Sequence, residues 1–230
     1  MEYKEFAKYY DKFYQKKDYK KEVNFLMNFI KPGDRIIDIG CGTGIHASLI
    51  SKAGYEVDAL DLNKEMLDIA KKRLNSSLYL QDILNINIDK KYDIIISMFA
   101  VINHLKDTSE LEKCLLNMKN ILRGSGTIVI DLHNPQSSGK KADNIDNMSR
   151  IMEWHYDKKT KIEKSRIIFE IDNQKYEDSH IFRIFTIDEV KECCDKVGLK
   201  VINIYGNYDI NKEGVETSKN LQFIIKYRAY

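Results

Sequence analysis

The sequence predicts an α/β protein whose core is a doubly wound, mostly parallel sheet. From residue 35 to residue 131, short apolar runs typical of buried strands alternate with stretches whose apolar residues recur every three or four positions. A glycine-rich loop at residues 40–44 follows the first of these strands. Alternating strands and helices favour parallel strands covered on both faces, because each crossover helix returns the chain to the same edge of the sheet.

The elements can be placed in chain order. Residues 3–30 carry apolar side chains at helical spacing, which predicts two amphipathic helices with a break near Lys17-Asp18. Residues 93–97 show no polar alternation, as expected of a central strand covered on both faces. The predicted alternating elements are strand 35–39, helix 43–53, strand 56–60, helix 63–74, strands 78–80 and 92–97, helix 109–122 and strand 126–131.

The pattern changes after Asp131. Residues 133–149 are polar and are predicted to form a loop. Three alternating segments then predict a small antiparallel sheet, at 151–156, 161–172 and 176–186. Thr186 and Glu189 have the spacing of a capping box and predict a helix over 187–197. Strands near 199–205 and 221–228 complete the main sheet, with an antiparallel edge strand at the C-terminus.

Composition limits the class of protein. Of 230 residues, 43% are hydrophobic and 31% charged, which fits a folded globular chain rather than a membrane bundle or a disordered one. The 37 basic and 35 acidic side chains leave a net charge of +2, which disfavours nucleic acid as a partner. We find no apolar signal core and no run of eighteen apolar residues, so we expect a cytoplasmic protein without a membrane segment. The four cysteines form no C-x-x-C pair, and no metal site is expected.

The glycine loop has the sequence Asp38-Ile39-Gly40-Cys41-Gly42-Thr43-Gly44 and joins a strand to a helix. Glycine lets the backbone turn sharply and approach a ligand, and the helix N-terminus offers free N–H groups. The spacing is G-x-G-x-G rather than the G-x-G-x-x-G of dinucleotide-binding loops, and no G-K-[ST] follows. The loop therefore indicates a ligand other than a dinucleotide or a P-loop triphosphate.

Three carboxylates are predicted to meet at the carboxyl edge of this sheet. Asp38 precedes the glycines, Asp61 ends the second strand and Asp82 ends the third. Open parallel sheets bind ligands at this edge, and an acid at the tip of the second strand can accept both hydroxyls of a ribose. Asp82 could accept a hydrogen bond from an adenine amino group. The pattern favours a ligand with donor or cationic groups over one with many phosphates.

With these motifs the chain resembles the class I S-adenosylmethionine-dependent methyltransferases over roughly residues 34–131. The resemblance implies that the three loop glycines pass the methionine moiety, Asp61 holds the ribose, and Asp82 with Ile83 frames the adenine. Asp38 would face the amino group of the ligand. The predicted cofactor site comprises Tyr10, Tyr19, Asp38, Gly40, Cys41, Gly42, Gly44, Asp61, Leu62, Met66, Asp82, Ile83, Ser97 and Met98.

A closer resemblance is to the sugar N-methyltransferases that build dimethylamino deoxysugars. It rests on the spacing of the N-terminal tyrosines, on the S-M-F-x-x-x-x-H-L stretch ending at His104-Leu105, and on Ser179-His180. After the fifth strand that group is similar to an acidic residue followed by tryptophans, and this sequence departs from it with Asp131-Leu132-His133-Asn134-Pro135.

The sequence therefore predicts methyl transfer from S-adenosylmethionine to a small-molecule acceptor, with an amine such as an amino sugar favoured. His104, Tyr3 and His180 are the candidate catalytic residues, and His104 could act as a base or as a positioning group. We expect a methyltransferase domain at 1–132 and 187–230, with 133–186 as a cap over the acceptor site.

Other functions and properties stay open. The alternatives are an O-methyltransferase of a small metabolite, a nucleic-acid (tRNA) methyltransferase, a cofactor-binding module without catalysis, and a nicotinamide-dependent oxidoreductase. A homodimer is also open.

Overall fold

The computed structural model describes residues 3–145, 148–171 and 173–228, without the side chains of 3–6 and 145. Within these residues, the main sheet has eight strands in the order β11-β10-β12-β5-β4-β1-β2-β3. The strands from β5 to β3 run parallel, which confirms the predicted doubly wound sheet. Their bounds are β1 Ile36–Ile39, β2 Val57–Asp61, β3 Leu78–Leu80, β4 Tyr92–Ser97, β5 Leu122–His133, β10 Leu199–Gly206, β11 Asp209–Glu213 and β12 Asn220–Tyr227.

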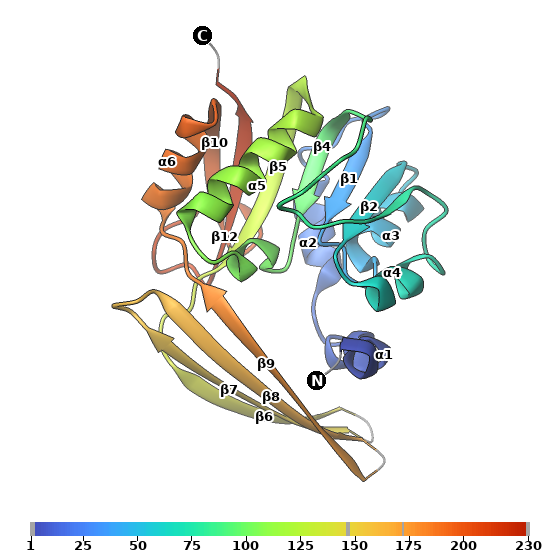
Figure 1. Cartoon of the computed structure of the whole chain (residues 1–230), viewed down its shortest axis with the longest axis vertical. Helices are drawn as coiled ribbons and strands as arrows, with labels where there is room; N and C mark the ends of the chain where they lie inside the picture. Colours follow the sequence, from blue (N-terminus) through green and yellow to red (C-terminus); the bar gives the residue numbers. More distant parts are fainter. Residues whose placement is uncertain (1–2, 146–147, 172, 229–230) are drawn as a thin grey trace.

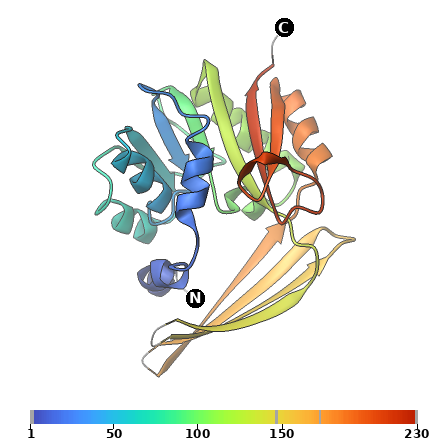
Figure 2. The same cartoon turned by 180° about the vertical axis from the view of Figure 1, so that it is seen from behind.

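Helices cover both faces of this sheet (Figures 1 and 2). Helices α5 and α6 pack on one face through a core that includes Leu115 and Val190, and helices α2, α3 and α4 pack on the other through Leu26 and Ile50. The predicted helix at 43–53 begins later, because Gly44 is a left-handed N-cap that leaves Thr43 in the loop. The bounds are α2 Tyr19–Leu26, α3 Ile45–Lys52, α4 Lys64–Ala70, the 3-10 helix η1 Val101–His104, α5 Thr108–Ile121 and α6 Ile187–Lys196.

The C-terminal part of the sheet differs from the prediction in one respect. Strand β12 was expected at the edge, but it lies between β5 and β10 and is antiparallel to both. The edge is the short strand β11, which the sequence analysis missed. Its five residues are all exposed and mostly polar, so they carry no apolar alternation that could mark a strand.

The second sheet is antiparallel and has four strands in the order β6-β7-β8-β9 among the described residues. The predicted loop at 133–149 is partly wrong, because residues 139–145 pair with β7 as the outer strand β6. An edge strand can be polar, since one side of it faces water. The bounds are β6 Gly139–Ile145, β7 Met148–Asp157, β8 Ile162–Ile171 and β9 Gln174–Arg183.

Helix α1 (Tyr3–Phe13) lies beside the second sheet, below the carboxyl edge of the main sheet (Figure 1). Phe13 packs edge-on against Phe169 of β8, with ring centroids 4.5 Å apart. The guanidinium of Arg150 on β7 donates to the carbonyl oxygen of Phe13 at 2.7 Å. The second sheet therefore holds the C-terminal end of helix α1.

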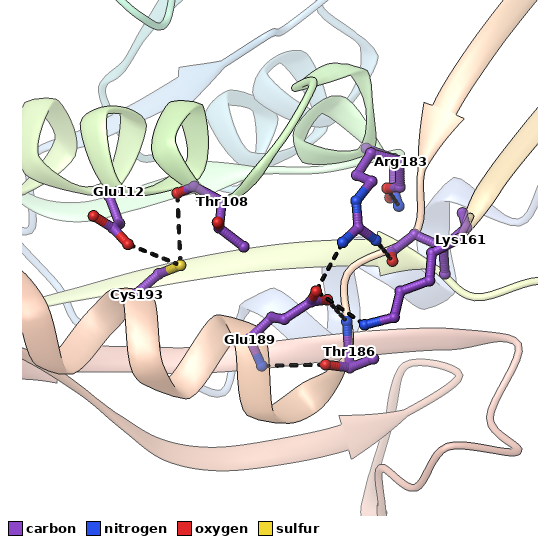
Figure 3. A network of polar contacts seen from close by, with 9 residues as sticks. Thr108, Glu112, Lys161, Arg183, Thr186, Glu189 and Cys193 are labelled. Atoms are coloured by element: carbon purple, nitrogen blue, oxygen red, sulfur yellow. Dashed lines mark hydrogen bonds and ion pairs between the residues drawn. The ribbon is translucent and has the colours of Figure 1, made fainter. Parts of the chain in front are cut away.

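A polar junction fixes the second sheet to the main domain (Figure 3). Glu189 of α6 accepts from Arg183 at 2.7 Å and from Lys161 at 2.9 Å. Thr186 and Glu189 also form the predicted capping box at the start of α6. The base of the second sheet and the start of α6 thus share one carboxylate.

Candidate active site

A cavity of about 1000 Å³ is lined by the loops at the carboxyl edge of the main sheet, by α1 and by strands of the second sheet. Predicted site residues that line it are Tyr10, Tyr19, Gly40, Cys41, Gly42, Asp61, Leu62, Met66, Asp82, Ile83, Met98, His104 and His180. Asp38, Gly44 and Ser97 do not line it: Asp38 and Ser97 are buried, and Gly44 caps α3. The side chain of Tyr3 lies outside the described part of the chain. The roles of all these residues stay predictions.

The three loop glycines have different local reasons to be glycine. All have positive φ, at +73° for Gly40, +54° for Gly42 and +77° for Gly44. A Cβ on Gly40 would come within 2.5 Å of Val101, and one on Gly44 within 3.0 Å of Ala70, so these two also pack closely. A Cβ on Gly42 would meet nothing within 4 Å, and its N–H donates to Asp61 at 2.7 Å. Gly42 therefore presents open backbone to the cavity.

Two buried carboxylates lie next to this loop. Asp38 is 1% exposed, and its Oδ2 has no hydrogen-bond partner among the described residues. Burial raises the pKa of Asp38 to about 6. Asp61 accepts from the N–H groups of Gly42 and Asn63, at 2.7 and 2.8 Å, and burial raises its pKa as well. A buried carboxylate oxygen without a donor is costly, so a cationic or donor-bearing ligand fits this edge.

The third predicted acid, Asp82, follows β3 and accepts from the N–H of Leu84 at 2.8 Å. It lines the cavity together with Ile83, on the side of Asp61 where β2 and β3 pair. The open backbone at Gly42 and the acids after β2 and β3 line the cavity and suit a molecule with a ribose and an adenine. Asp38 does not line the cavity, but it leaves an unpartnered buried oxygen beside the glycine loop. The residues present thus fit S-adenosylmethionine.

The N-terminal segment is tied to the glycine loop by polar contacts. Asp11 of α1 accepts from the hydroxyl of Thr43 at 2.6 Å and pairs with Arg73. Arg73 in turn donates to the carbonyl of Thr43 at 2.7 Å. Because Tyr10 precedes Asp11 and lines the cavity, these contacts place α1 over the cofactor side.

A buried cluster supports the floor of the cavity. Lys17 pairs with Glu22 and lies 4.6 Å from the ring centre of Tyr19 and 4.5 Å from that of Phe99. Glu22 also contacts Nε2 of His46 at 2.7 Å. Burial, and then the charge of Glu22, raise the pKa of Tyr19. The Lys17-Asp18-Tyr19 motif thus contributes a buried cation with aromatic and acidic neighbours.

The turn after β4 carries local strain that Asp131 stabilises. Phe99 and Ala100 have positive φ, at +67° and +61°, although neither is glycine. Asp131 of β5 is 2% exposed, accepts from the N–H of Ala100 at 2.7 Å and accepts from the hydroxyl of Tyr208. Phe99 and Ala100 both line the cavity, so this carboxylate shapes the wall next to η1.

Two predicted catalytic histidines lie close together, His104 on η1 and His180 on β9 of the second sheet. The ring of His104, at the end of η1, lies 5.9 Å from that of His180 and 4.8 Å from that of Phe182 on β9. His104 is exposed toward the cavity, yet the surrounding protein and then His180 lower its pKa to about 4. His180 pairs with Asp178 at 3.1 Å. At neutral pH, His104 therefore offers an uncharged ring to the cavity.

Asn103 holds this region together. Its side chain is 0% exposed, accepts from the N–H of His133 at 2.8 Å and donates to the carbonyl of Arg183 at 2.9 Å. One amide thereby connects η1 with the ends of β5 and β9. The position of His104 is fixed by this buried neighbour in the sequence.

Sequence reasoning missed several residues of the cavity wall. His133 at the end of β5 contacts the buried Glu163 of β8 at 3.1 Å, and Phe182 and Trp154 supply aromatic surface from the second sheet. Aromatic side chains thus reach the cavity from β7 and β9. Phe182 could have been found, because it is two residues from His180 and so shares its face of a strand.

These features agree with comparisons to known proteins. The family model described as "Methyltransferase domain" matches residues 10–204, which is most of the chain. The chain therefore belongs to the methyltransferase domain family, which confirms the resemblance seen in its glycine loop and strand-end acids. Its cofactor is S-adenosylmethionine.

Among relatives, a putative methyltransferase, YqeM of Bacillus subtilis, is 28% identical over 138 residues, covering 58% of this chain and 56% of that protein. A dTDP-3-amino-3,4,6-trideoxy-alpha-D-glucopyranose N,N-dimethyltransferase of Streptomyces venezuelae is 28% identical over 120 residues, covering 50% of this chain and 51% of that protein. The chain thus spans about half the length of these two relatives.

Solved structures extend the similarity in fold to nearly the whole chain. A methyltransferase from Clostridium acetobutylicum has a TM-score of 0.84 at 22% identity, covering 99% of both chains. Streptomyces venezuelae DesVI has a TM-score of 0.81 at 23% identity, covering 97% of this chain and 98% of that one. Within the described residues of this protein, no helix combines the length and the apolar character that crossing a membrane requires.

Proposed function

We propose that this protein transfers a methyl group from S-adenosylmethionine to the neutral amine nitrogen of a small molecule. The observation that carries the proposal is that His104 and His180, with ring centres 5.9 Å apart, line the same cavity as the glycine loop. When bound, S-adenosylmethionine supplies a methyl carbon that an amine lone pair can attack, while the C–S bond breaks and its electron pair stays on sulfur. Such a displacement depends mainly on holding the nucleophile in line.

The state of His104 favours nitrogen over oxygen as the nucleophile. A hydroxyl has to lose its proton as it attacks, and a base with a pKa near 4 is too weak to take it efficiently at neutral pH. A neutral amine already has a free lone pair and needs an acceptor for its N–H that orients it. His104 can supply this acceptor, and the proton leaves the methylated product afterwards. The similarity to sugar N,N-dimethyltransferases supports an amine, such as that of an amino sugar.

The second sheet contributes side chains to the wall of this cavity. Trp154, His180 and Phe182 come from the segment that we expected to cap the acceptor site, and they line the same cavity as the glycine loop. Residues 133–186 are therefore proposed to bind the acceptor, while the parallel sheet binds the cofactor.

The test is formation of S-adenosylhomocysteine from S-adenosylmethionine with matched acceptors, glucosamine against glucose, and a series of simple amines against the corresponding alcohols. We expect turnover with amines alone and a rate that rises with pH as the amine is deprotonated. Equal turnover of the alcohols would contradict the amine proposal. Tight NAD binding with no response to S-adenosylmethionine would contradict methyl transfer altogether.

A further inference from the structure

The acceptor side of the cavity is rich in carboxylates and poor in cations. Outside the cofactor positions, the acids that line it are Glu110, Asp131, Glu153 and Glu163. Among the described residues that line the cavity, the lysines are Lys106 and Lys219, both exposed, and there is no arginine. Lys106 is already paired with Glu110 at 3.4 Å. A diphosphate is bound best by several cations, and the described lining residues offer only these two exposed lysines.

Three of these four acids already accept hydrogen bonds from the protein or face water. Asp131 accepts from Ala100 and from Tyr208. Glu110 accepts from the backbone N–H of Lys106 at 2.8 Å. The side chain of Glu153 is 39% exposed and pairs with Lys140 at 2.7 Å. Glu163 is the acid to consider for a bound molecule, because it is buried and its described side-chain partner, His133, contacts only one of its carboxylate oxygens.

Glu163 is a buried carboxylate in the wall of the cavity. It is 3% exposed. Within the described residues, its side-chain polar contact is the one between Oε2 and Nε2 of His133, at 3.1 Å. On the neighbouring strand it lies opposite Phe182, whose ring contacts both His104 and His180. A carboxylate in such surroundings attracts a cation strongly, because little water screens it. Aromatic rings beside it would add cation–π attraction.

We propose that the acceptor is a small amine that carries a second, positively charged group and no phosphate. Glu163, oriented by His133, holds the charged group, and His104 faces the nitrogen that receives the methyl. Phe182 and Trp154 cover the apolar part between the two nitrogens. This proposal rests on the proposed amine methylation and adds the substrate class.

The experiment measures binding by calorimetry to the protein saturated with S-adenosylhomocysteine. The probes are diaminoalkanes of three to six carbons, the matched n-alkylamines, and thymidine diphosphate. A monoamine lacks the second amine and so cannot form the buried charge-assisted hydrogen bond to Glu163. We therefore expect at least one diamine to bind about ten- to a hundredfold more tightly than its monoamine. In Glu163→Gln this advantage should fall to about threefold or less, with an unchanged affinity for S-adenosylhomocysteine.

The matched control is Glu170→Gln, which changes an exposed carboxylate on the same strand β8 and should keep the full diamine advantage. The second variant is His133→Gln, which should lose part of the advantage, because Glu163 then lacks its orienting partner. Unchanged diamine binding in Glu163→Gln, no diamine binding by the wild type, or thymidine diphosphate binding as tightly as the amines would each overturn the proposal. The proposed function fails separately, by absence of S-adenosylhomocysteine binding or of amine methylation.

Discussion

The two sides of the cavity differ in how their residues are distributed along the chain. The proposed cofactor side is lined mainly by residues between 40 and 98, most of them in the glycine loop or just after β2, β3 and β4. The acceptor side draws His104 from η1, His133 from β5, Glu163 from β8 and His180 from β9. The first side uses backbone N–H groups and strand-end acids, whereas the second uses side chains that alternate along strands. If this proposed division holds, we expect cofactor binding to persist while the acceptor side changes, because few positions are shared.

Replacing residues 138–182 with a short glycine-serine turn is the strongest test of this division. We expect methyl turnover to fall below detection, because Trp154, His180 and Phe182 are lost with the second sheet. Affinity for S-adenosylhomocysteine should fall less than about tenfold, since α1 loses Phe169 as a support but keeps Asp11 on the glycine loop. Calorimetry and a turnover assay measure the two quantities. An equal loss of both, in a variant that still unfolds cooperatively, would mean that the two sides are not separable.

Asp61→Ala tests the cofactor side alone. The variant removes a carboxylate proposed to accept both ribose hydroxyls, each charge-assisted bond being worth about 1.5–3 kcal/mol before water replaces it. Affinity for S-adenosylmethionine should fall at least about tenfold, as measured by calorimetry. Asp68→Ala is the control, because Asp68 is 60% exposed and pairs with Lys64 on the outside of α4. An unaffected affinity in Asp61→Ala would place the ribose elsewhere.

His104→Asn sharpens the account of the acceptor side. If His104 positions an amine, turnover should slow only a few-fold, because asparagine still offers a hydrogen-bond acceptor. Loss of a general base would cost about 10²–10⁴-fold in turnover. Steady-state kinetics between pH 5 and 9 distinguish the two. No change in turnover or in acceptor KM would show that His104 is structural, and the acceptor would then lie nearer Tyr3 and His180.

The depressed pKa of His104 also predicts how stability depends on pH. The folded chain binds a proton at this ring with a pKa of about 4, and the unfolded chain with the ordinary value of 6.5. Between these values the unfolded chain holds more protons, so the His104 contribution to stability is lost as pH falls from 6.5 toward 4. Urea unfolding of the wild type and His104→Asn should show a shallower pH dependence in the variant. Parallel curves would argue against the depressed pKa.

Thr186→Ala is expected to have the smallest effect and probes the junction between the two sides. Removing the N-cap hydroxyl should destabilise α6 by about 1 kcal/mol and lower Tm by about 2–4 °C. Cofactor affinity should not change, because Glu189 still pairs with Arg183 and Lys161. Scanning calorimetry checks the shift. A larger loss, accompanied by weaker acceptor binding, would show that the capping box also positions the second sheet.

The parallel core could be predicted from the sequence because its signals are local. Buried strands such as 93–97 and the turn at Gly40–Gly44 each carry their signal within a few residues. Strand β6 could not be predicted, because its polar residues become a strand only through pairing with β7. Glu163 and His133 were missed for a similar reason. They meet across thirty positions of sequence, and neither belongs to a motif that specifies the other.

Helix α1 contacts both sides of the cavity, with Asp11 on the glycine loop and Phe13 on the second sheet. Any movement that separates the second sheet from the core must therefore break the contacts of Asp11 or those between Arg150 and the Phe13 carbonyl. Entry and exit of a bound molecule by that movement pass through the same transition state, in which these contacts are broken. If the bound molecule leaves by that movement, its residence time and the maximal turnover rate depend on α1, a helix that contains none of the histidines of the site.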